Sequence, residues 1–137
     1  MKPKLLIGGK HSDSRGILCY NNDFDSSFVR RIYVIENADT SFVRGWQGHK
    51  VEQRWFSVMQ GRFKIQLIEV DNWECPSKKP DILSYIIDTE RLDVLHIPKG
   101  FISSIQALSI GSKLLVMSDY RLNEINDEYR FSLDYFE

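Results

Sequence analysis

Strand-forming residues recur along the chain in short apolar runs, and residues that favour turns separate these runs. Gly8-Gly9 and Pro98-Lys99-Gly100 are typical separators, because glycine and proline ease the backbone into turns. Helical periodicity is nearly absent before position 121, and residues 121–126 predict a turn or two of helix at most. The pattern predicts ten strands: residues 4–7, 16–20, 31–36, 41–45, 53–59, 62–70, 83–87, 94–97, 102–108 and 114–118. Closely spaced short strands are typical of a β sandwich or barrel, so we expect one all-β domain over residues 1–137.

A hairpin around Gln60-Gly61 is the clearest single unit in this pattern. With a two-residue loop, alternate residues of both arms point to one side. The apolar residues that would then share a face are Phe56, Val58, Phe63, Ile65 and Leu67. We expect this face to belong to the hydrophobic core.

Composition narrows the class of protein. The chain has 137 residues, 42% of them hydrophobic, which suffices for one domain with a substantial core. Its 18 Lys and Arg residues against 19 Asp and Glu give a net charge of −1, so no general electrostatic field attracts nucleic acid or an anionic membrane. No apolar run approaches the roughly 20 residues that span a bilayer. We therefore expect neither nucleic acid nor membrane as a partner.

The amino end and the cysteines favour a reduced, cytoplasmic protein. The apolar stretch in the first nine residues is too short for a signal peptide. Cys19 and Cys75 form neither a C-x-x-C pair nor a disulfide framework, and no basic neighbour in sequence lowers the pKa of either thiol. We interpret both cysteines as structural.

Three polar motifs interrupt this ordinary β pattern: residues 13–16, residues 44–50 continuing through position 54, and residues 95–101. Gln47 and His49 are two positions apart, so both side chains of an extended strand point to one face. Such a pair would line the mouth of a barrel, and Pro98-Lys99-Gly100 would end a second lining strand. Each motif alone is a weak signal, whereas their order and spacing together are much more specific.

The three motifs resemble those of the jelly-roll cupin fold. They are most similar to its nucleotide-sugar branch, the deoxythymidine-diphosphate-sugar 3,5-epimerases and especially the WxcM-like 3,4-ketoisomerases. The matching segments cover nearly the whole chain: Asp13-Ser14-Arg15-Gly16, Arg31-Ile32-Tyr33-Val34-Ile35, residues 44–50, residues 98–106 and Ser118-Asp119-Tyr120. The resemblance implies a double-stranded β-helix (jelly-roll cupin) that forms a homodimer and binds a nucleoside-diphosphate-linked keto-sugar in the barrel mouth.

Departures from the family pattern argue against a metal and against double epimerisation. Metal-binding cupins use a His-x-His pair and a late histidine, where this chain has Gln47 and Ser103, which are poor transition-metal ligands even with Glu52 nearby. We expect no metal and no other cofactor. The 3,5-epimerases use a histidine base where Gln47 stands and a late tyrosine acid near Leu115. An amide cannot take a proton from carbon, so a double epimerisation is disfavoured.

The resemblance implies catalytic roles for His49 and Tyr33. A 3,4-ketoisomerase needs a proton shuttle, and His49 is the only residue of the cluster with a suitable ordinary pKa, about 6.5. Tyr33 would donate a hydrogen bond to the developing oxyanion. Planar guanidinium groups suit a diphosphate and an amide suits a sugar oxygen. The expected substrate-binding residues are Arg15, Arg44, Gln47, Gln53 and Arg54.

The phase of alternation after His49 is ambiguous. Strict alternation puts Gln53 and Trp55 on the lining face and the apolar Phe56 and Val58 opposite. Either that apolar face packs elsewhere, for example at a dimer contact, or the chain kinks over residues 50–52 and resets the alternation.

The sequence therefore favours a metal-free, cofactor-free isomerase or epimerase acting on a 4-keto-6-deoxy sugar linked to deoxythymidine diphosphate, in surface-polysaccharide sugar biosynthesis. A second hypothesis is a catalytically silent nucleotide-sugar-binding or regulatory cupin that has lost its base. A metal-dependent cupin oxygenase or sugar isomerase is a weaker third. Residues 4–7 would supply an exposed edge strand to a dimer, and the aromatic, acidic tail from position 127 onwards would cross the barrel as a strap.

Overall fold

The computed structural model describes residues 1–137, and every regular element in it is a β-strand. The elements are β1 Lys4–Leu6, β2 Gly9–Asp13, β3 Gly16–Tyr20, β4 Arg31–Ile35, β5 Val43–His49, β6 Arg54–Gln60, β7 Phe63–Glu69, β8 Leu83–Ile87, β9 Val94–Ile97, β10 Phe101–Ala107, β11 Lys113–Ser118 and β12 Glu128–Arg130. The all-β, double-stranded β-helix prediction is confirmed. No helix exists that is long and apolar enough to cross a membrane.

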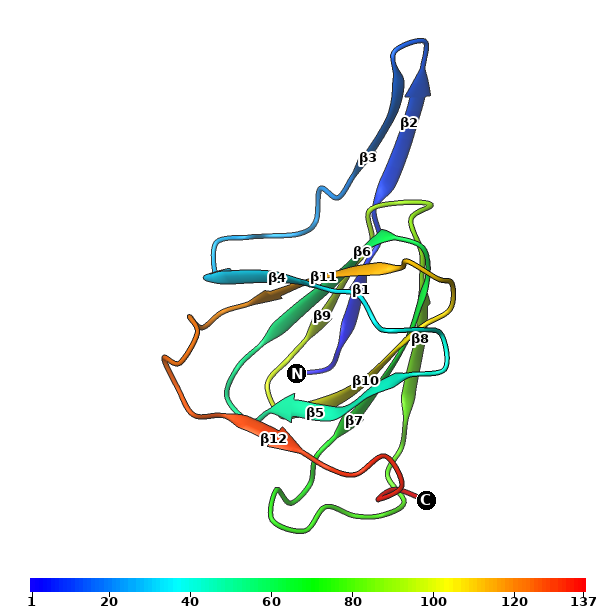
Figure 1. Ribbon diagram of the computed structural model, residues 1–137. Helices are drawn as coiled ribbons and strands as arrows, with labels where there is room; N and C mark the ends of the chain where they lie inside the picture. The colour runs from blue at the N-terminus through cyan, green and yellow to red at the C-terminus, as the bar shows by residue number, and fades with distance from the viewer.

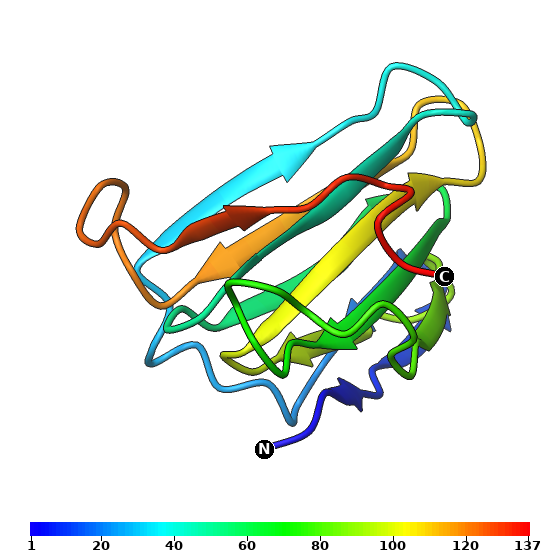
Figure 2. The same ribbon diagram turned by 90° about the horizontal axis from the view of Figure 1, so that it is seen from below.

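Two five-stranded antiparallel sheets face each other (Figures 1 and 2). One has the order β1-β9-β6-β11-β4 and the other the order β12-β5-β10-β7-β8. β2 and β3 form a separate two-stranded arm that projects away from both sheets (Figure 1). The core between the sheets contains 13 buried hydrophobic residues, among them the fully buried Ile65 and Leu67 of β7. Alternation along each strand sends every second side chain into this layer.

The chain crosses between the two sheets at Gln60-Gly61. β6 pairs with β9 and β11, whereas β7 pairs with β8 and β10, so the predicted hairpin is wrong. The predicted shared apolar face is nevertheless found in the core, because the inward faces of opposite sheets meet there. Gly61 has φ +76°, and a Cβ at this position would lie 2.0 Å from Oγ of Ser112, so the crossing requires glycine.

The connection between β5 and β6 resets the strand alternation. The carboxylate of Asp127 accepts the backbone N–H groups of Lys50, Val51 and Glu52 at 3.0, 2.8 and 2.9 Å. These bonds hold the chain out of strand geometry between the end of β5 at His49 and the start of β6 at Arg54, a stretch of four residues. Phe56 therefore faces the core and not the outside, and the kink is confirmed over the alternative of an apolar face packed elsewhere.

The pattern of apolar runs did not predict two polar strands, β2 and β12. β2 (Gly-Lys-His-Ser-Asp) and β12 (Glu-Tyr-Arg) contain no apolar run, and only pairing with β3 and β5 makes them strands. β5 continues to His49 instead of ending at position 45, and residues 121–126 form turns without a helix. The tail after β12 is a strap, as expected, because Phe131 and Phe136 pack against Trp46 outside the central core.

Truncation of the core should cost far more stability than truncation of the surface. We expect Ile65→Ala to lower the free energy of unfolding by about 2–5 kcal/mol, since the cavity it leaves cannot collapse fully. Ile110→Ala is the matched control, because Ile110 is 90% exposed, and it should change stability by less than about 0.5 kcal/mol. Chemical denaturation of both variants measures this, and equal losses would contradict the assigned core.

Candidate active site

A cavity of about 420 Å³ lies between the sheets. β5 contributes Gln47 and His49 to its wall, β4 contributes Tyr33, β6 contributes Arg54 and β10 contributes Ser103. A second hollow of about 210 Å³ is lined by the loop of residues 121–126 and by Asp127 and Glu128. Both are bordered by Tyr33, Gln47, His49 and Arg54, so these side chains lie where the two spaces meet.

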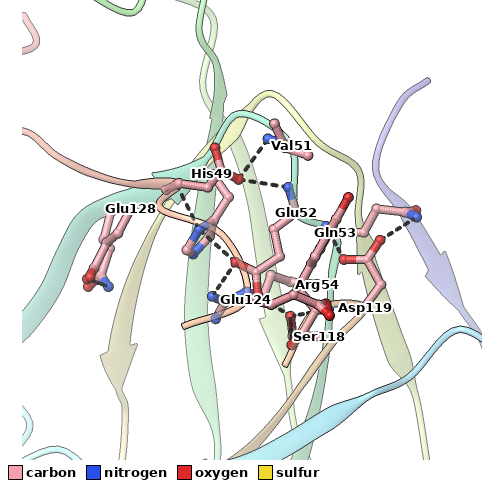
Figure 3. Close-up of polar contacts among 12 residues, drawn as sticks. His49, Val51, Glu52, Gln53, Arg54, Ser118, Asp119, Glu124 and Glu128 are labelled. Atoms are coloured by element: carbon pink, nitrogen blue, oxygen red, sulfur yellow. Dashed lines mark hydrogen bonds and ion pairs between the residues drawn. The ribbon is translucent and has the colours of Figure 1, made fainter. Parts of the chain in front are cut away.

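His49 is held by a carboxylate and a backbone carbonyl. Its Nδ1 lies 3.0 Å from a carboxylate oxygen of Glu52 and 3.1 Å from the carbonyl oxygen of Asp127 (Figure 3). Both partners are acceptors, so the neutral ring carries its proton on Nδ1 and leaves the lone pair on Nε2. The side chains of His49 and Glu52 are only 10% and 8% exposed. The site therefore presents a shielded imidazole whose free nitrogen is available as a base.

Arg54 links this pair to Tyr33. Its Nη2 donates to the Glu52 carboxylate at 3.3 Å, and its Nη1 donates to the Tyr33 hydroxyl. Ser118 donates to the other oxygen of Glu52. The guanidinium of Arg31 lies 4.6 Å from the centre of the Tyr33 ring and borders both cavities. The phenol thus lies in a cationic environment that would stabilise negative charge developing nearby.

Burial lowers the pKa of His49 below its ordinary value of 6.5. The positive charge of Arg54 lowers it further, whereas the charges of Glu52 and Asp127 and the hydrogen bond to the Asp127 backbone oppose the shift. Burial dominates because a charged imidazolium loses water on entering the protein. His49 is therefore neutral near pH 7 and able to accept a proton.

One group of side chains has the composition of a metal site. The ligand atoms of His49, Glu52 and Asp127 lie within 4.8 Å of one another. However, Asp127 already accepts three backbone N–H groups, and Glu52 accepts bonds from Ser118, His49 and Arg54. A cation would have to break these bonds beside the guanidinium of Arg54. The donor set fits a metal poorly, and the metal-free site stays a prediction.

The structure brings together five of the seven residues that the sequence singled out. Tyr33, Arg44, Gln47, His49 and Arg54 all line the larger cavity. Arg44 donates to the side-chain oxygen of Asn37 at 3.4 Å, and Gln47 donates to the carboxylate of Glu128.

Gln53 does not border either cavity. The kink turns it to the outer face, where its backbone and side-chain amides donate to Asp119 at 2.8 and 3.1 Å and its oxygen lies 2.7 Å from Nε2 of His96. Its predicted place on the lining face is thus corrected. His96 itself stacks on Trp55 outside the central core.

Arg15 lies on the β2–β3 arm, away from the cavity of its own chain. Its side chain is 85% exposed and pairs with Asp13 at 2.8 Å. Its predicted contact with a ligand is therefore not formed within a single chain, because the arm leaves the sheets (Figure 1).

Leu115 also lies outside the cavity, in the outer cluster of Trp55. Its inward-facing neighbours on β11, Leu114 and Val116, are both apolar, so β11 offers no acid in place of a late tyrosine.

Glu52 and Asp127 belong to the candidate site, and sequence reasoning largely missed them. Glu52 entered only as a nearby carboxylate for a metal, and Asp127 only as part of the acidic tail. The spacing of three residues between His49 and Glu52 is a weak signal, since it brings them together only across the kink. Asp127 is 78 residues from His49 in sequence, so no local pattern could identify that contact.

Comparisons with known proteins bear on the family and the fold of this chain. The model of the family described as FdtA, WxcM-like C-terminal, matches residues 4–136. A 3,4-ketoisomerase from Helicobacter canadensis has a TM-score of 0.73 at 25% identity, covering 98% of this chain and 95% of its own. The 3,4-ketoisomerase QdtA from Thermoanaerobacterium thermosaccharolyticum, a histidine-to-asparagine mutant in complex with TDP-4-keto-6-deoxyglucose, has a TM-score of 0.73 at 20% identity, covering 98% and 91%. The rmlC epimerase from Mycobacterium tuberculosis has a TM-score of 0.74 at 15% identity, covering 96% and 69%. No curated protein sequence matches the chain.

The lowered pKa of His49 should make stability depend on pH. The unfolded chain protonates His49 near pH 6.5, whereas the folded chain does so only at lower pH. The stabilisation is complete above the unfolded pKa and declines as pH falls towards the folded pKa, because the unfolded state then binds more protons. In denaturation experiments, the free energy of unfolding of His49→Asn should fall less than that of the wild type when the pH is lowered from about 7.5 to about 5.5. His96, whose pKa is also lowered by burial, supplies the dependence that remains. Equal losses in both proteins would contradict the prediction.

Proposed function

Since the chain belongs to the FdtA family of WxcM-like C-terminal domains, we propose that it is a sugar-nucleotide isomerase. Its substrate is a 4-keto-6-deoxy sugar linked to deoxythymidine diphosphate, and it moves the carbonyl between C4 and C3. The observation that carries this proposal is the neutral His49 beside a cavity that the Tyr33 hydroxyl also borders. A base and an acid around one keto-sugar are the minimum that such an isomerisation needs.

The reaction needs only proton transfers. Nε2 of His49 takes the proton from C3, and the C3–H electron pair forms a C3–C4 double bond while the C4 carbonyl oxygen takes a proton from Tyr33. The resulting enediol then returns the proton of its C3 oxygen to Tyr33, and C4 takes the proton held by His49. Each group ends in its starting state, so the step needs no oxidant, reductant or cofactor. The guanidinium groups of Arg31 and Arg54 stabilise the negative charge that Tyr33 carries in between.

Binding of the sugar nucleotide would use the polar wall of the larger cavity. A volume of about 420 Å³ lies within the range of roughly 300–1,000 Å³ that is typical of small-molecule sites. Arg44 and Arg31 border it and suit a diphosphate, since a guanidinium can contact two oxygens at once. The amide of Gln47, which already donates to Glu128, suits a sugar hydroxyl. In this arrangement Arg54 is engaged by Glu52 and Tyr33 and is not a diphosphate ligand.

A second candidate function is supported by the polar residues beside His49 on the cavity wall. Gln47 and Ser103 border the same cavity but neither has a basic lone pair, so a single histidine remains for proton transfer. A chain that has lost further catalytic groups would be a silent nucleotide-sugar-binding or regulatory module.

Replacement of His49 should separate binding from chemistry. We expect His49→Asn to lower kcat by at least about 100-fold, because the proton shuttle is lost, while affinity for the nucleotide sugar changes little. His96→Asn is the matched control, since His96 lies on the outer face and should keep wild-type turnover. The measurement is incubation with dTDP-4-keto-6-deoxyglucose in deuterated water, followed by detection of ring deuterium and product, with calorimetry for binding.

Two outcomes would change the assignment. Wild-type protein that binds the nucleotide sugar without exchange or product would select the silent module. Undiminished exchange in His49→Asn would place the base elsewhere.

We also propose that the protein is a homodimer, and that Arg15 meets the ligand only there. The arm exposes Ile17 and Leu18 (64% and 61%), and the edge strand β4 exposes Ile32 and Val34 (64% and 55%). Exposed apolar residues on an arm and on an unpaired strand edge favour coverage by another chain. A second copy would also bring its Arg15 to a cavity that no chain's own arm reaches.

Disruption of the exposed strand face tests this arrangement. We expect sedimentation at twice the chain mass of 16.1 kDa, and a monomer for Ile32→Glu because a charge cannot be buried unpaired in an apolar contact. Ile110→Glu is the control, since Ile110 is exposed on a loop between β10 and β11 and should leave the dimer intact. In the dimer, Arg15→Ala should weaken nucleotide-sugar binding. Wild-type sedimentation as a monomer across micromolar concentrations would contradict the proposal.

A further inference from the structure

Glu52 has an unusual position for a carboxylate, because it lies between the proposed base, His49, and Arg54. The guanidinium of Arg54 in turn binds the hydroxyl of Tyr33, the proposed acid. One of its oxygens is shared by Nδ1 of His49 at 3.0 Å and Nη2 of Arg54 at 3.3 Å. Its other oxygen accepts a bond from the buried Ser118. All the close partners of this carboxylate are therefore donors from the protein itself, and they engage both of its oxygens.

Arg54 is likewise turned towards the protein. Its side chain is 11% exposed, one terminal nitrogen bonds Glu52 and the other bonds the Tyr33 hydroxyl. Its Nε is buried without a hydrogen-bond partner. Burial of a cation in this way is tolerated because the neighbouring carboxylate neutralises it. The guanidinium is planar and rigid. The bond from Nη2 to Glu52 therefore also fixes the position of Nη1, which donates to the Tyr33 hydroxyl.

We propose that Glu52 and Arg54 are positioning residues that join the catalytic base to the catalytic acid, so that His49 and Tyr33 are set at a fixed separation across the cavity. This inference rests on the proposed isomerase function. It assigns to Arg54 a role other than the substrate contact that its sequence position suggests, and it gives Glu52 a role other than metal binding. A cavity lined by one histidine has no second imidazole base to compensate for misplacement, so this rigidity matters more here.

Glu52 and Arg54 also act on the pKa of His49, in opposite directions. The Glu52 charge raises the pKa of His49 and the Arg54 charge lowers it. The other charged groups near His49 are Asp127, whose charge also raises the pKa, and Arg31, Arg121 and Glu128, which border the smaller hollow. Variants of Glu52 and Arg54 leave those groups in place, so the two effects can be measured separately.

Opposite shifts in the titration of His49 form the first test, and they need no activity. We expect the pKa of His49, followed by NMR of the ring, to fall in Glu52→Gln and to rise in Arg54→Gln. Asp93→Asn is the matched control: Asp93 is a buried carboxylate paired with an arginine, Arg91, at 3.2 Å, but it lies outside both cavities. This control should leave the His49 titration unchanged even if it lowers stability.

Kinetics form the second test. Glu52→Gln and Arg54→Lys should each lower kcat by about 100-fold with little change in KM, since a displacement near 1 Å of the reacting groups has an effect of this size. Arg54→Lys keeps the charge but not the two-armed geometry, so its acid limb in the pH profile of kcat/KM should stay close to that of the wild type. The acid limb of Glu52→Gln should move to lower pH.

The double variant Glu52→Gln, Arg54→Gln guards against failure to fold, because it removes both buried charges together. It should fold and show a kcat no lower than the worse of the two single variants, as expected for residues that act as a unit. Wild-type kcat and an unshifted His49 titration in Glu52→Gln would overturn the inference. Absence of turnover in the wild type would instead overturn the proposed function, and the titration would still decide whether Glu52 and Arg54 control His49.

Discussion

The rest of the site depends on the kink between β5 and β6, which the carboxylate of Asp127 stabilises. By accepting three consecutive backbone N–H groups from residues 50–52, it stabilises a break between β5 and β6 that pairing alone would not maintain. A charged acceptor makes such bonds stronger than neutral ones, so one side chain can fix a kink. The same residue offers its backbone carbonyl to Nδ1 of His49. The kink and the orientation of the imidazole therefore have a common origin in a segment that precedes β12.

The kink has two consequences that bear on function. It returns Phe56 to the core, which lets β6 bury an apolar face between the sheets. It also places Glu52 and Arg54 at the boundary of the cavity, next to His49. Charges at such depth are tolerated only when paired and hydrogen-bonded, and the set of His49, Glu52, Arg54 and Ser118 meets this condition with the exception of one guanidinium nitrogen. Burial keeps the base neutral, and the charges of Glu52 and Arg54 act on the pKa of His49 in opposite directions.

Most of the strands could be predicted from the sequence, because β-branched and aromatic runs between turn residues report local preference and burial together. β3, β8 and β9 have the predicted bounds. The partners of the strands could not be predicted in the same way. β6 and β7 are joined by two residues and share an apolar face, yet they pair in different sheets. Alternation reports which side of a strand is buried, and both a hairpin and a crossing between sheets satisfy it equally. β2 and β12 lack an apolar run and become strands only through their partners.

The sequence by itself determined the all-β class and the motifs that indicate the family, and it singled out His49 as the candidate base, because each of these depends on residue types at short spacing. It also placed Tyr33, Arg44, Gln47 and Arg54 correctly around one cavity. Only the tertiary structure decided that Gln53 faces outward, that Arg15 leaves its own chain's cavity on an arm, and that Glu52 joins the base to Arg54. These facts depend on long-range contacts, such as those of Asp127 with Lys50, Val51 and Glu52. These three residues precede Asp127 by 75 to 77 positions in the chain. The periodicity of a strand carries no information about contacts made over such a distance.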